Sequence, residues 1–510
     1  MNLLHTHPKD IDTDKYRDLL KTGLSHCAQC RGLTVAIVGA GMAGLIAGKL
    51  LKSAGFHIRI YEASQRVGGR VKTFRDGLTS GLYAEAGAMR IPKGHSLTRS
   101  LCKSLGLTLI RFPEDDDSNT LAYVNGRRIT MQDYNKGNKG FDAPYTTGHT
   151  TTAILKNALD CLKRRDDKEL DRISLGDYLY EFTKPGAKNP VTGKPIPTKH
   201  QIDSADLDLI GFESGVSELR ASLLEAYRDH KALIGKKLQI SNGMDNLPIE
   251  LVKQDQEIQD SLRYNARVIE IRRIGDKSLD VIYEHPVTHS RYTREDIAFV
   301  ILAAPFSALT HVRLDNALGP TQLRAIRNLH YDNATKIALE FSDRFWERKR
   351  GGSISGGRSF TDLPIRWVHY PAKAQYGKGT SRGVLLASYT WGDDSLRWAS
   401  LREVDRIRFA ARDVAALHGF TSEGDDKWFN SLLVGGVSHS WAQDEYTFGA
   451  FSLFDPRQET ELFDAIWQPY KRVHFAGEHT SLKHGWIEGA LESGIRAALE
   501  IYQEVTKSSK

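Results

Sequence analysis

The stretch Thr34–Gly44, TVAIVGAGMAG, decides the fold of this chain. It begins with a short β-branched and apolar run, which predicts a buried strand, and it leads into residues with the composition of a helix. Between the two stand Gly39, Gly41 and Gly44. The first glycine permits a tight turn, the second lets a pyrophosphate approach the backbone, and the third lets the helix pack closely on the strand. Because a helix N-terminus also attracts phosphate groups, the stretch predicts a dinucleotide-binding turn.

The residues around this turn complete a β-α-β unit. We expect strands at Thr34–Val38 and His57–Tyr61, with a helix at Ala43–Ala54 between them. Glu62 follows the second strand directly, where a carboxylate can accept a hydrogen bond from a ribose hydroxyl. A lone G-x-G-x-x-G pattern would be weak evidence, but here the strand, the helix and the acidic residue together indicate a bound dinucleotide.

The next segment indicates that the dinucleotide is FAD. Arg66–Thr73, RVGGRVKT, follows Glu62 almost immediately. Its glycine pair lets the backbone run beside a cofactor, and Arg70 can neutralise pyrophosphate charge. This extension is typical of FAD-binding proteins of the amine-oxidase type and differs from the pattern of NAD dehydrogenases.

A second FAD motif lies near the C-terminus. Val473–Thr480, VHFAGEHT, places Glu478 where it can hold the ribityl chain. The segment after it predicts a long helix that starts near Trp486 or Ile487. The positive end of this helix, directed at the flavin, would stabilise the anionic reduced cofactor.

The order of these segments predicts a discontinuous multidomain fold. A chain of 510 residues is too long for one core. Apolar strands of the same character recur at Phe299–Ala303 and Val473–Ala476, so other domains must be inserted between them. We expect α/β and α+β architecture: a Rossmann-like FAD-binding domain (31–76, 237–320, 435–505), a mixed-sheet substrate-binding domain (77–149, 321–434), a helical domain (150–236), and an N-terminal helix and linker (1–30).

Composition and charge exclude several classes of function. The chain is 40% hydrophobic and 26% charged, which is ordinary for a globular protein. Its net charge of +7 is spread among acidic residues, so we expect no nucleic-acid partner. No stretch approaches the roughly 20 apolar residues of a membrane helix, and no secretory signal is visible. These features predict a cytoplasmic protein without a membrane partner.

Two local features are interpreted as structural. Cys27 and Cys30 form a C-x-x-C beside His26, but no second pair follows at zinc-site spacing and no thioredoxin-like helix opens there. We therefore expect no metal site. Thr183–His200 has four prolines and no apolar periodicity, which predicts a mobile surface loop.

With these motifs in place, the chain resembles the L-amino-acid oxidase branch of the flavin monoamine oxidase family, which includes snake-venom and bacterial enzymes. The resemblance runs from about Tyr16 to Tyr502 and is weakest in the expected helical domain. Besides the FAD motifs, it rests on GAMRIP (Gly87–Pro92), SNGMDNLP (Ser241–Pro248), NATKIALEF (Asn333–Phe341), TDLPIRWVHYP (Thr361–Pro371) and KHGWIEGA (Lys483–Ala490).

The resemblance implies a set of substrate-binding and catalytic residues. Arg90 and Tyr370 are expected to clamp the substrate carboxylate, since a planar guanidinium pairs with a carboxylate bidentately. Lys336 is expected to hold a water near flavin N5, where a cation favours electron transfer to oxygen. Gly485 and Trp486 are expected beside the substrate. The expected cofactor contacts are Gly39, Gly41, Met42, Ala43, Gly44, Glu62, Ala63, Gly69, Arg70, Gly87, Ala88, Met89, Arg90, Val268, Gly477, Glu478, Trp486, Ile487 and Ala490.

No catalytic base can be assigned from the sequence. Some family members have a histidine in the helical domain that has been considered for this role, and the offset from SNGMD brings Tyr227 near that place, with His230 three residues on. Hydride transfer from Cα needs only a neutral amine, which ordered solvent could help to produce.

The reaction implied by the resemblance is FAD-dependent oxidative deamination of an L-amino acid with O2, giving a 2-oxo acid, ammonia and hydrogen peroxide. Three alternatives stay open: an amine or polyamine oxidase, a tryptophan-type amino-acid 2-monooxygenase of the same fold, and a non-catalytic flavin-binding protein. Arg90 and Tyr370 disfavour the first, because a simple amine has no carboxylate to bind. A homodimer or higher homo-oligomer is expected. The side-chain preference is hidden in the helical insertion and in the strands around Trp391 and Trp441.

Overall fold

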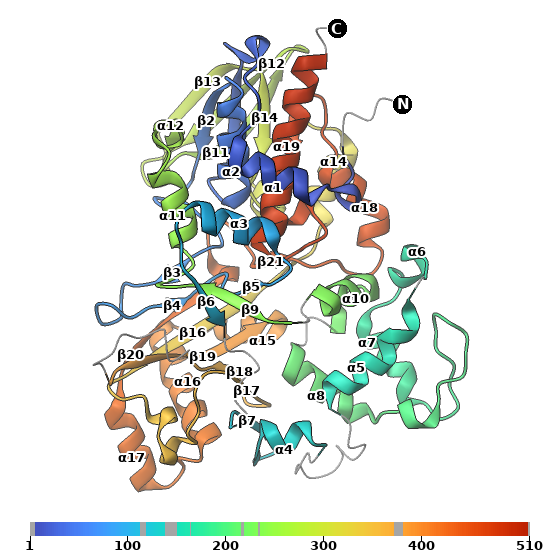
Figure 1. The fold of residues 1–510 in the computed structure, drawn as a ribbon, viewed down its shortest axis with the longest axis vertical. Coiled ribbons are helices and arrows are strands. Elements are labelled where there is room, and N and C mark those ends of the chain that lie inside the picture. The colour runs from blue at the N-terminus through green and yellow to red at the C-terminus, as the bar shows by residue number, and fades with distance from the viewer. Residues whose placement is uncertain are drawn as a thin grey trace.

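A parallel sheet is the centre of the upper part of the molecule (Figure 1). The computed structural model describes residues 6–112, 119–137, 150–163, 165–215, 219–232, 235–371 and 381–507. The sheet has the order β10-β2-β1-β14-β22, and all its pairings are parallel. Its strands are β1 (Thr34–Val38), β2 (His57–Tyr61), β10 (Leu262–Arg263), β14 (Phe299–Leu302) and β22 (Val473–Phe475).

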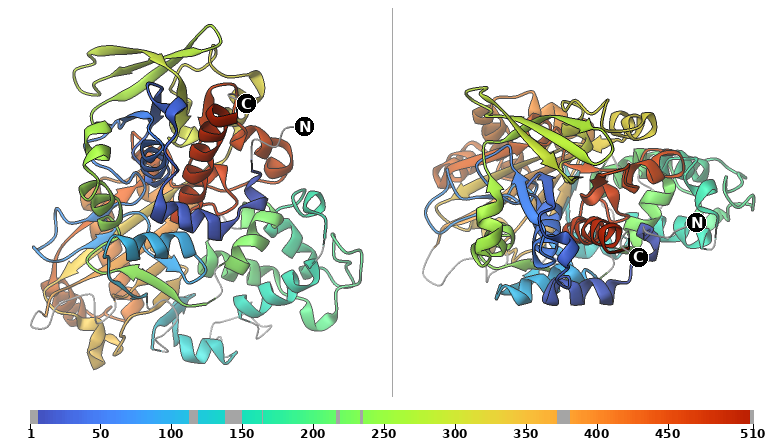
Figure 2. Two further views of the ribbon diagram at one scale, coloured as in Figure 1. Left: turned by 45° about the horizontal axis from the view of Figure 1, so that its top comes forward. Right: turned by 90° about the horizontal axis from the view of Figure 1, so that it is seen from above.

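This sheet is covered on both faces, as a parallel sheet requires. Val35 and Ile37 pack with the helices α2 (Met42–Ser53) and α19 (Ile487–Lys507), which lie side by side in Figures 1 and 2. The alternate residues of β1 face the opposite core, together with the three-stranded antiparallel sheet β11-β12-β13. The strands of that sheet are β11 (Arg267–Ile274), β12 (Ser278–Glu284) and β13 (Arg291–Ile297).

A seven-stranded sheet forms the second layer, with the order β20-β16-β19-β18-β17-β7-β8. Its strands are β7 (Leu121–Val124), β8 (Arg127–Thr130), β16 (Ala334–Phe341), β17 (Arg358–Thr361), β18 (Trp367–His369), β19 (Gly383–Trp391) and β20 (Leu433–Ser440). The helices α16 (Glu403–His418) and α17 (Glu423–Leu432) cover one of its faces through a core rich in aromatic residues (Figure 1). The other face is turned toward the parallel sheet, so the two sheets enclose the space between them.

Smaller sheets and helices join these layers. The small sheets are β3 (Thr73–Phe74) with β4 (Ala84–Glu85), β15 (Tyr331–Asp332) with β21 (Phe451–Ser452), and β9 (Lys237–Ile240) between β5 (Ile91–Pro92) and β6 (Leu109–Phe112). The connecting helices are α1 (Thr13–Thr22), α3 (Ser96–Ser104), α4 (Met131–Asn135), α11 (Asn246–Lys253), α12 (Gln256–Ser261), α13 (Phe306–Leu309), α14 (Pro320–Asn328), α15 (Gly392–Ala399) and α18 (Gln458–Trp467).

A group of helices with its own apolar core lies beside the seven-stranded sheet (Figure 1). They are α5 (Thr151–Leu159), α6 (Asp167–Leu170), α7 (Leu175–Tyr180), α8 (Ser204–Ser214) and α10 (Leu223–Ala232). The loop expected at Thr183–His200 has internal order: Lys188 and Pro195 form a β-bridge, the Asn189 side chain accepts hydrogen bonds from two backbone N–H groups, and Ile196 is buried. Its mobility stays a prediction, as do the domain boundaries.

The remaining local expectations concern the cysteines and the membrane. Cys27 and Cys30 are buried and free, and burial raises the pKa of the Cys30 thiol to about 12, helped by its hydrogen bond to Cys27. No group of three metal-ligating side chains occurs among the described residues. Within the same residues, no helix is long and apolar enough to cross a membrane.

Candidate active site

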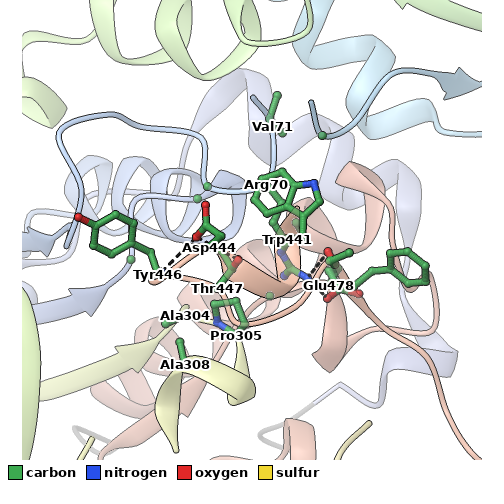
Figure 3. A pocket seen from close by; sticks show the side chains of 18 of the residues that line it. Arg70, Val71, Ala304, Pro305, Ala308, Trp441, Asp444, Tyr446, Thr447 and Glu478 are labelled. Atoms are coloured by element: carbon green, nitrogen blue, oxygen red, sulfur yellow. Dashed lines mark hydrogen bonds and ion pairs between the residues drawn. The ribbon is translucent and has the colours of Figure 1, made fainter. Parts of the chain in front are cut away.

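A cavity of about 530 Å³ runs between the two large sheets. The phosphate turn and Glu62 line one part of it, and Lys336, Tyr389 and Trp486 line another. Figure 3 shows a stretch of its wall, in which Arg70 and Glu478 face each other near Trp441. All the expected cofactor contacts line this cavity with the exception of Gly44.

The glycine turn has the geometry that its sequence predicts. Gly41 is the N-cap of α2, and a Cβ added there would meet nothing within 4 Å, so the turn leaves open space beside the helix N-terminus. A Cβ at Gly44 would lie 2.1 Å from the Gly39 carbonyl oxygen. Gly44 therefore permits close packing of the helix on the turn, which explains why it lies behind the cavity wall.

The second glycine pair crosses over this turn. The Gly68 N–H donates to the Ala40 carbonyl oxygen at 2.9 Å, and a Cβ at Gly69 would touch the Gly41 Cα at 3.5 Å. Gly68 and Gly69 have φ of +99° and +55°, a region that favours glycine. The RVGGR segment thereby forms a second backbone wall beside the phosphate turn.

Glu62 is held rigidly at the end of β2. One carboxylate oxygen accepts the Ala40 N–H at 2.9 Å, and the other accepts the Ser64 N–H at 2.9 Å and the Ser64 hydroxyl at 2.7 Å. The side chain is 8% exposed and lines the cavity. An acidic group is thus fixed at the place where the sequence predicts ribose binding.

Arg70 and Glu478 form a buried ion pair across the cavity wall (Figure 3). The Arg70 Nη1 lies 2.6 Å from a Glu478 carboxylate oxygen, and Glu478 also accepts the Gly485 N–H at 2.9 Å and the Ser452 hydroxyl at 2.7 Å. Burial alone would raise the pKa of Glu478, but Arg70, then nearby histidines and the Gly485 N–H, lower it to about 2. The carboxylate is therefore charged, and it ties the C-terminal motif to the first FAD motif.

Lys336 is a buried lysine on β16, with 1% of its surface exposed. Its ammonium donates to the Gly87 carbonyl oxygen at 2.6 Å and lies 4.5 Å from the centre of the Tyr389 ring. Burial lowers the pKa of Lys336 to about 7, with Glu85 opposing and Arg90 assisting this shift. Lys336 is therefore not an exposed residue of the strand, and its ammonium faces the cavity.

Arg90 and Trp486 lie together on the cavity wall. The Arg90 guanidinium carbon is 5.8 Å from the centre of the Trp486 ring, and His95 contacts the same ring edge-on at 5.0 Å. Helix α19 begins at Ile487, immediately after Trp486, so its N-terminus also borders the cavity. The structure thus brings Arg90, Gly485, Trp486 and Lys336 into one site.

Tyr370 does not line this cavity, and this corrects the sequence analysis. Its hydroxyl lies 3.0 Å from both the Ser359 hydroxyl and His418 Nε2, in the core beneath α16. Side chains alternate along a strand, and Tyr370 follows Val368 onto the face that α16 covers. Tyr370 therefore faces away from the cavity that Arg90 lines.

Tyr389, unlike Tyr370, lines the cavity. It lies on β19 directly opposite Lys336 and lines the cavity, as does Trp391 two residues on. The two rings contact each other edge-on, with centres 5.7 Å apart. An aromatic pair at i and i+2 on an apolar strand is a signal that could have identified this wall from the sequence.

The helical segment also contributes a residue that sequence reasoning missed. Asp229 lines the cavity, whereas Tyr227 and His230 do not. Helix α10 carries all three, but only Asp229 is on the face that reaches the site. The offset from SNGMD therefore leads to the part of α10 that borders the cavity, and the identity of a base stays open.

Comparison with known proteins identifies the family. The family model described as flavin containing amine oxidoreductase matches residues 42–502. The chain belongs to this family. Its cofactor is FAD, and the chain is a flavoprotein oxidoreductase. The cavity fits FAD because the glycine turn leaves open space beside the N-terminus of α2, and because Glu62, Arg70 and the start of α19 line the same cavity.

Several relatives of the family are named for amino-acid oxidation. A putative L-amino-acid oxidase of Bacillus subtilis is 34% identical over 95% of this chain and 97% of its own length. The L-amino-acid oxidase of the fish Siganus canaliculatus is 34% identical over 97% of this chain and 90% of its own length. The L-amino-acid oxidase of the viper Vipera ammodytes ammodytes is 29% identical over 97% of this chain and 97% of its own length. These relatives agree with the branch that the sequence motifs indicated.

Solved structures of the family share the fold. Putrescine oxidase bound to putrescine superposes with a TM-score of 0.69 at 20% identity, covering 92% of this chain and 99% of its own. Cyclohexylamine oxidase from Brevibacterium oxydans gives 0.70 at 18% identity, covering 94% and 99%. The multidomain amine-oxidase fold expected from the sequence is confirmed.

A substitution at Gly41 tests the phosphate turn. A leucine there would place a branched side chain in the open space that the turn leaves beside α2. We expect Gly41→Leu to purify with less than about a tenth of the FAD of the parent, since the pyrophosphate loses its approach to the backbone. Absorbance at the flavin band per protein measures this occupancy. Gly424→Leu, at an exposed glycine with an ordinary φ whose Cβ also meets nothing within 4 Å, is the control, and full flavin in Gly41→Leu would disprove the turn's role.

Proposed function

We propose that this chain is an L-amino-acid oxidase, which converts an L-amino acid, O2 and water into a 2-oxo acid, ammonia and hydrogen peroxide. The observation that carries the proposal is the position of Arg90 in the flavin cavity, against Trp486 and near Lys336. A guanidinium there suits a substrate that brings a carboxylate. The names of the relatives point to the same reaction.

The roles of the side chains follow from their places. Arg90 would pair with the substrate carboxylate, and the Tyr389 hydroxyl would donate to the same group in place of Tyr370. Trp486 and Trp391 would enclose the substrate and exclude water. When bound, FAD accepts a hydride from Cα and passes two electrons to O2; the imino acid that remains is hydrolysed by water to the 2-oxo acid and ammonia. Self-association and the cellular location stay predictions.

The assay is direct. Purified holoenzyme is incubated with L-amino acids and air, and peroxide, ammonia and 2-oxo acid are measured separately. We expect the three products in equal amounts. An amide product with released carbon dioxide would instead assign the chain to the monooxygenases. Oxidation of simple amines alone would assign it to the amine oxidases.

Lys336 is expected to act on oxygen more than on the amino acid. Oxygen gains negative charge as it is reduced, and a buried ammonium stabilises that charge, so Lys336→Met should slow flavin reoxidation about 100-fold. Reduction by substrate should slow less than about threefold. Stopped-flow measurement of both half-reactions separates the two effects. Equal slowing of both would indicate a structural role.

The lowered pKa of Lys336 adds a pH dependence. Because the ammonium is present below a pKa of about 7 and is lost above it, reoxidation of the parent enzyme should slow as pH rises through that value. In Lys336→Met the rate of flavin reoxidation should no longer fall as pH rises through this value.

A further inference from the structure

Helix α10 carries two neighbouring carboxylates, one of which lines the cavity. Glu225 and Asp229 are four residues apart and therefore lie on the same face of the helix. Glu225 is 3% exposed, and Asp229 lines the cavity itself. Like charges at this spacing destabilise a helix, so the arrangement needs a compensating cation.

The charge of Glu225 is compensated inside the protein. His484 Nδ1 lies 2.7 Å from a Glu225 carboxylate oxygen, and Arg228 lies 3.9 Å from the other. Burial alone would lower the pKa of His484, but Glu225 raises it to about 9. His484 is therefore an imidazolium that neutralises Glu225.

Asp229 has no direct partner of this kind, although His484, Arg228 and Arg90 lie close enough to oppose the rise in its pKa. It forms no hydrogen bond or ion pair with any residue that the structure describes, and the adjacent Arg228 is bound to Glu459 at 2.7 Å. Burial, and then the nearby Glu225, raise the pKa of Asp229. The imidazole Nε2 of His484, which lines the same cavity, also lacks a hydrogen-bond partner among the described residues. A carboxylate left without a donor at a binding cavity is costly unless a ligand supplies the cation.

The cavity that Asp229 lines also has aromatic walls, which favour a cation. Tyr389, Trp391 and Phe451 line the cavity, and the Trp391 ring contacts the other two edge-on at 5.7 and 5.2 Å. Aromatic faces attract ammonium and guanidinium groups, and the attraction grows when water is excluded. The cavity thus offers Arg90 to a carboxylate of the ligand. It offers Asp229 and the aromatic side chains to a second group of the ligand, which carries positive charge.

The α-amine of the substrate is a poor match for that second group. The amine must be neutral when its Cα is oxidised, and a neighbouring carboxylate would hold it in the charged form. The cation therefore belongs to the substrate's side chain. We propose that Asp229 makes this site selective for L-amino acids with a cationic side chain, an ammonium or a guanidinium. This inference rests on the proposed oxidase function.

The first test compares arginine with citrulline, which has nearly the same shape and no charge. We expect kcat/KM of the parent for L-arginine to exceed that for L-citrulline at least about 100-fold, because the uncharged analogue leaves Asp229 unpaired. In Asp229→Asn the ratio should fall to within about fivefold, and Asp229→Glu should retain most of it. Asp208→Asn, which removes an exposed acid on α8, is the matched control and should keep the parent's ratio.

The second test measures binding without turnover. 5-Guanidinopentanoate has the carboxylate and guanidinium of arginine but no α-amine, and hexanoate has the carboxylate alone. The parent should bind the first at least about 30-fold more tightly by flavin absorbance titration, and Asp229→Asn should bind both equally.

The outcomes separate this inference from the proposed function. Efficient oxidation of leucine or phenylalanine with poor oxidation of arginine, ornithine and lysine would overturn the inference and leave the oxidase function standing. A uniform loss for all substrates in Asp229→Asn, with an unchanged arginine preference, would show a proton-transfer role instead. Absence of activity on every amino acid, together with equal binding of the two probes, would overturn both.

Discussion

Replacing Arg90 with alanine should lower kcat/KM for the preferred amino acid by roughly 30- to several-thousand-fold. The substrate carboxylate loses its water when it enters the cavity, and without the guanidinium it stays unpaired, which costs about 2–5 kcal/mol. The FAD content should stay near that of the parent, because Glu62, Arg70 and the glycine turns are untouched. Steady-state kinetics and the flavin absorbance per protein measure the two quantities independently.

Three further variants make this result specific to carboxylate binding. Arg90→Lys keeps the charge and loses the bidentate geometry, so its activity should fall between the parent and the alanine variant. Tyr389→Phe should raise KM about tenfold, because the lost hydrogen bond to a charged group is worth about 1.5 kcal/mol. Tyr370→Phe should change KM little, since its hydroxyl is bound to Ser359 and His418 outside the cavity. Unchanged activity of Arg90→Ala with amino acids would contradict the proposed substrate class.

The FAD-binding elements could be predicted from the sequence because local rules determine them. The strands at Thr34–Val38 and His57–Tyr61 have the expected bounds, and the helix between them starts one residue earlier than expected, at Met42. Each is a compact apolar run bounded by glycine or an acidic residue, and the turn between them is short. Helix α19 likewise begins at Ile487, where the sequence placed it. No long-range contact was needed to locate these elements.

The substrate wall could not be predicted in the same way, because it depends on which strand face is turned inward. Tyr370 and Tyr389 are both strand-associated tyrosines, and only the pairing of β19 with β16 brings Tyr389 opposite Lys336. Motif resemblance places a residue near a site along the chain, but one step along a strand reverses its face. The order of the seven strands, which is not the order of the sequence, decides this register.

Asp229 illustrates the same limit on a helix. The sequence directed attention to the turn that carries Tyr227 and His230, where a base was sought. Glu225 on α10 contacts His484, which lies 259 positions away in the sequence, and Asp229 is on the same face of the helix. Such a contact between distant segments has no local signature. The identity of a catalytic base stays open, and solvent can serve this role.

We expect the L-enantiomer of an amino acid to be oxidised at least about 1000-fold faster than the D-enantiomer. The carboxylate is assigned to Arg90 and Tyr389, the side chain to the wall formed by Asp229 and Trp391, and the α-hydrogen must point at the cofactor for transfer. Three of the four groups on Cα are then directed to different places, so only one hand of the substrate satisfies all of them. The relatives named L-amino-acid oxidase indicate which hand it is.

Stereoselectivity tests the whole site, because it depends on every assignment at once. L- and D-arginine are incubated separately with the holoenzyme, and 2-oxo acid and peroxide are quantified by mass spectrometry and a coupled assay. Binding of the D-isomer should persist as competitive inhibition, since its carboxylate and guanidinium can still reach Arg90 and Asp229 while its α-hydrogen points away. Comparable oxidation of both isomers would mean that the carboxylate is not held at Arg90. If D-arginine does not inhibit, the preference for the L-enantiomer arises because the D-enantiomer does not bind, and not because its Cα is wrongly oriented.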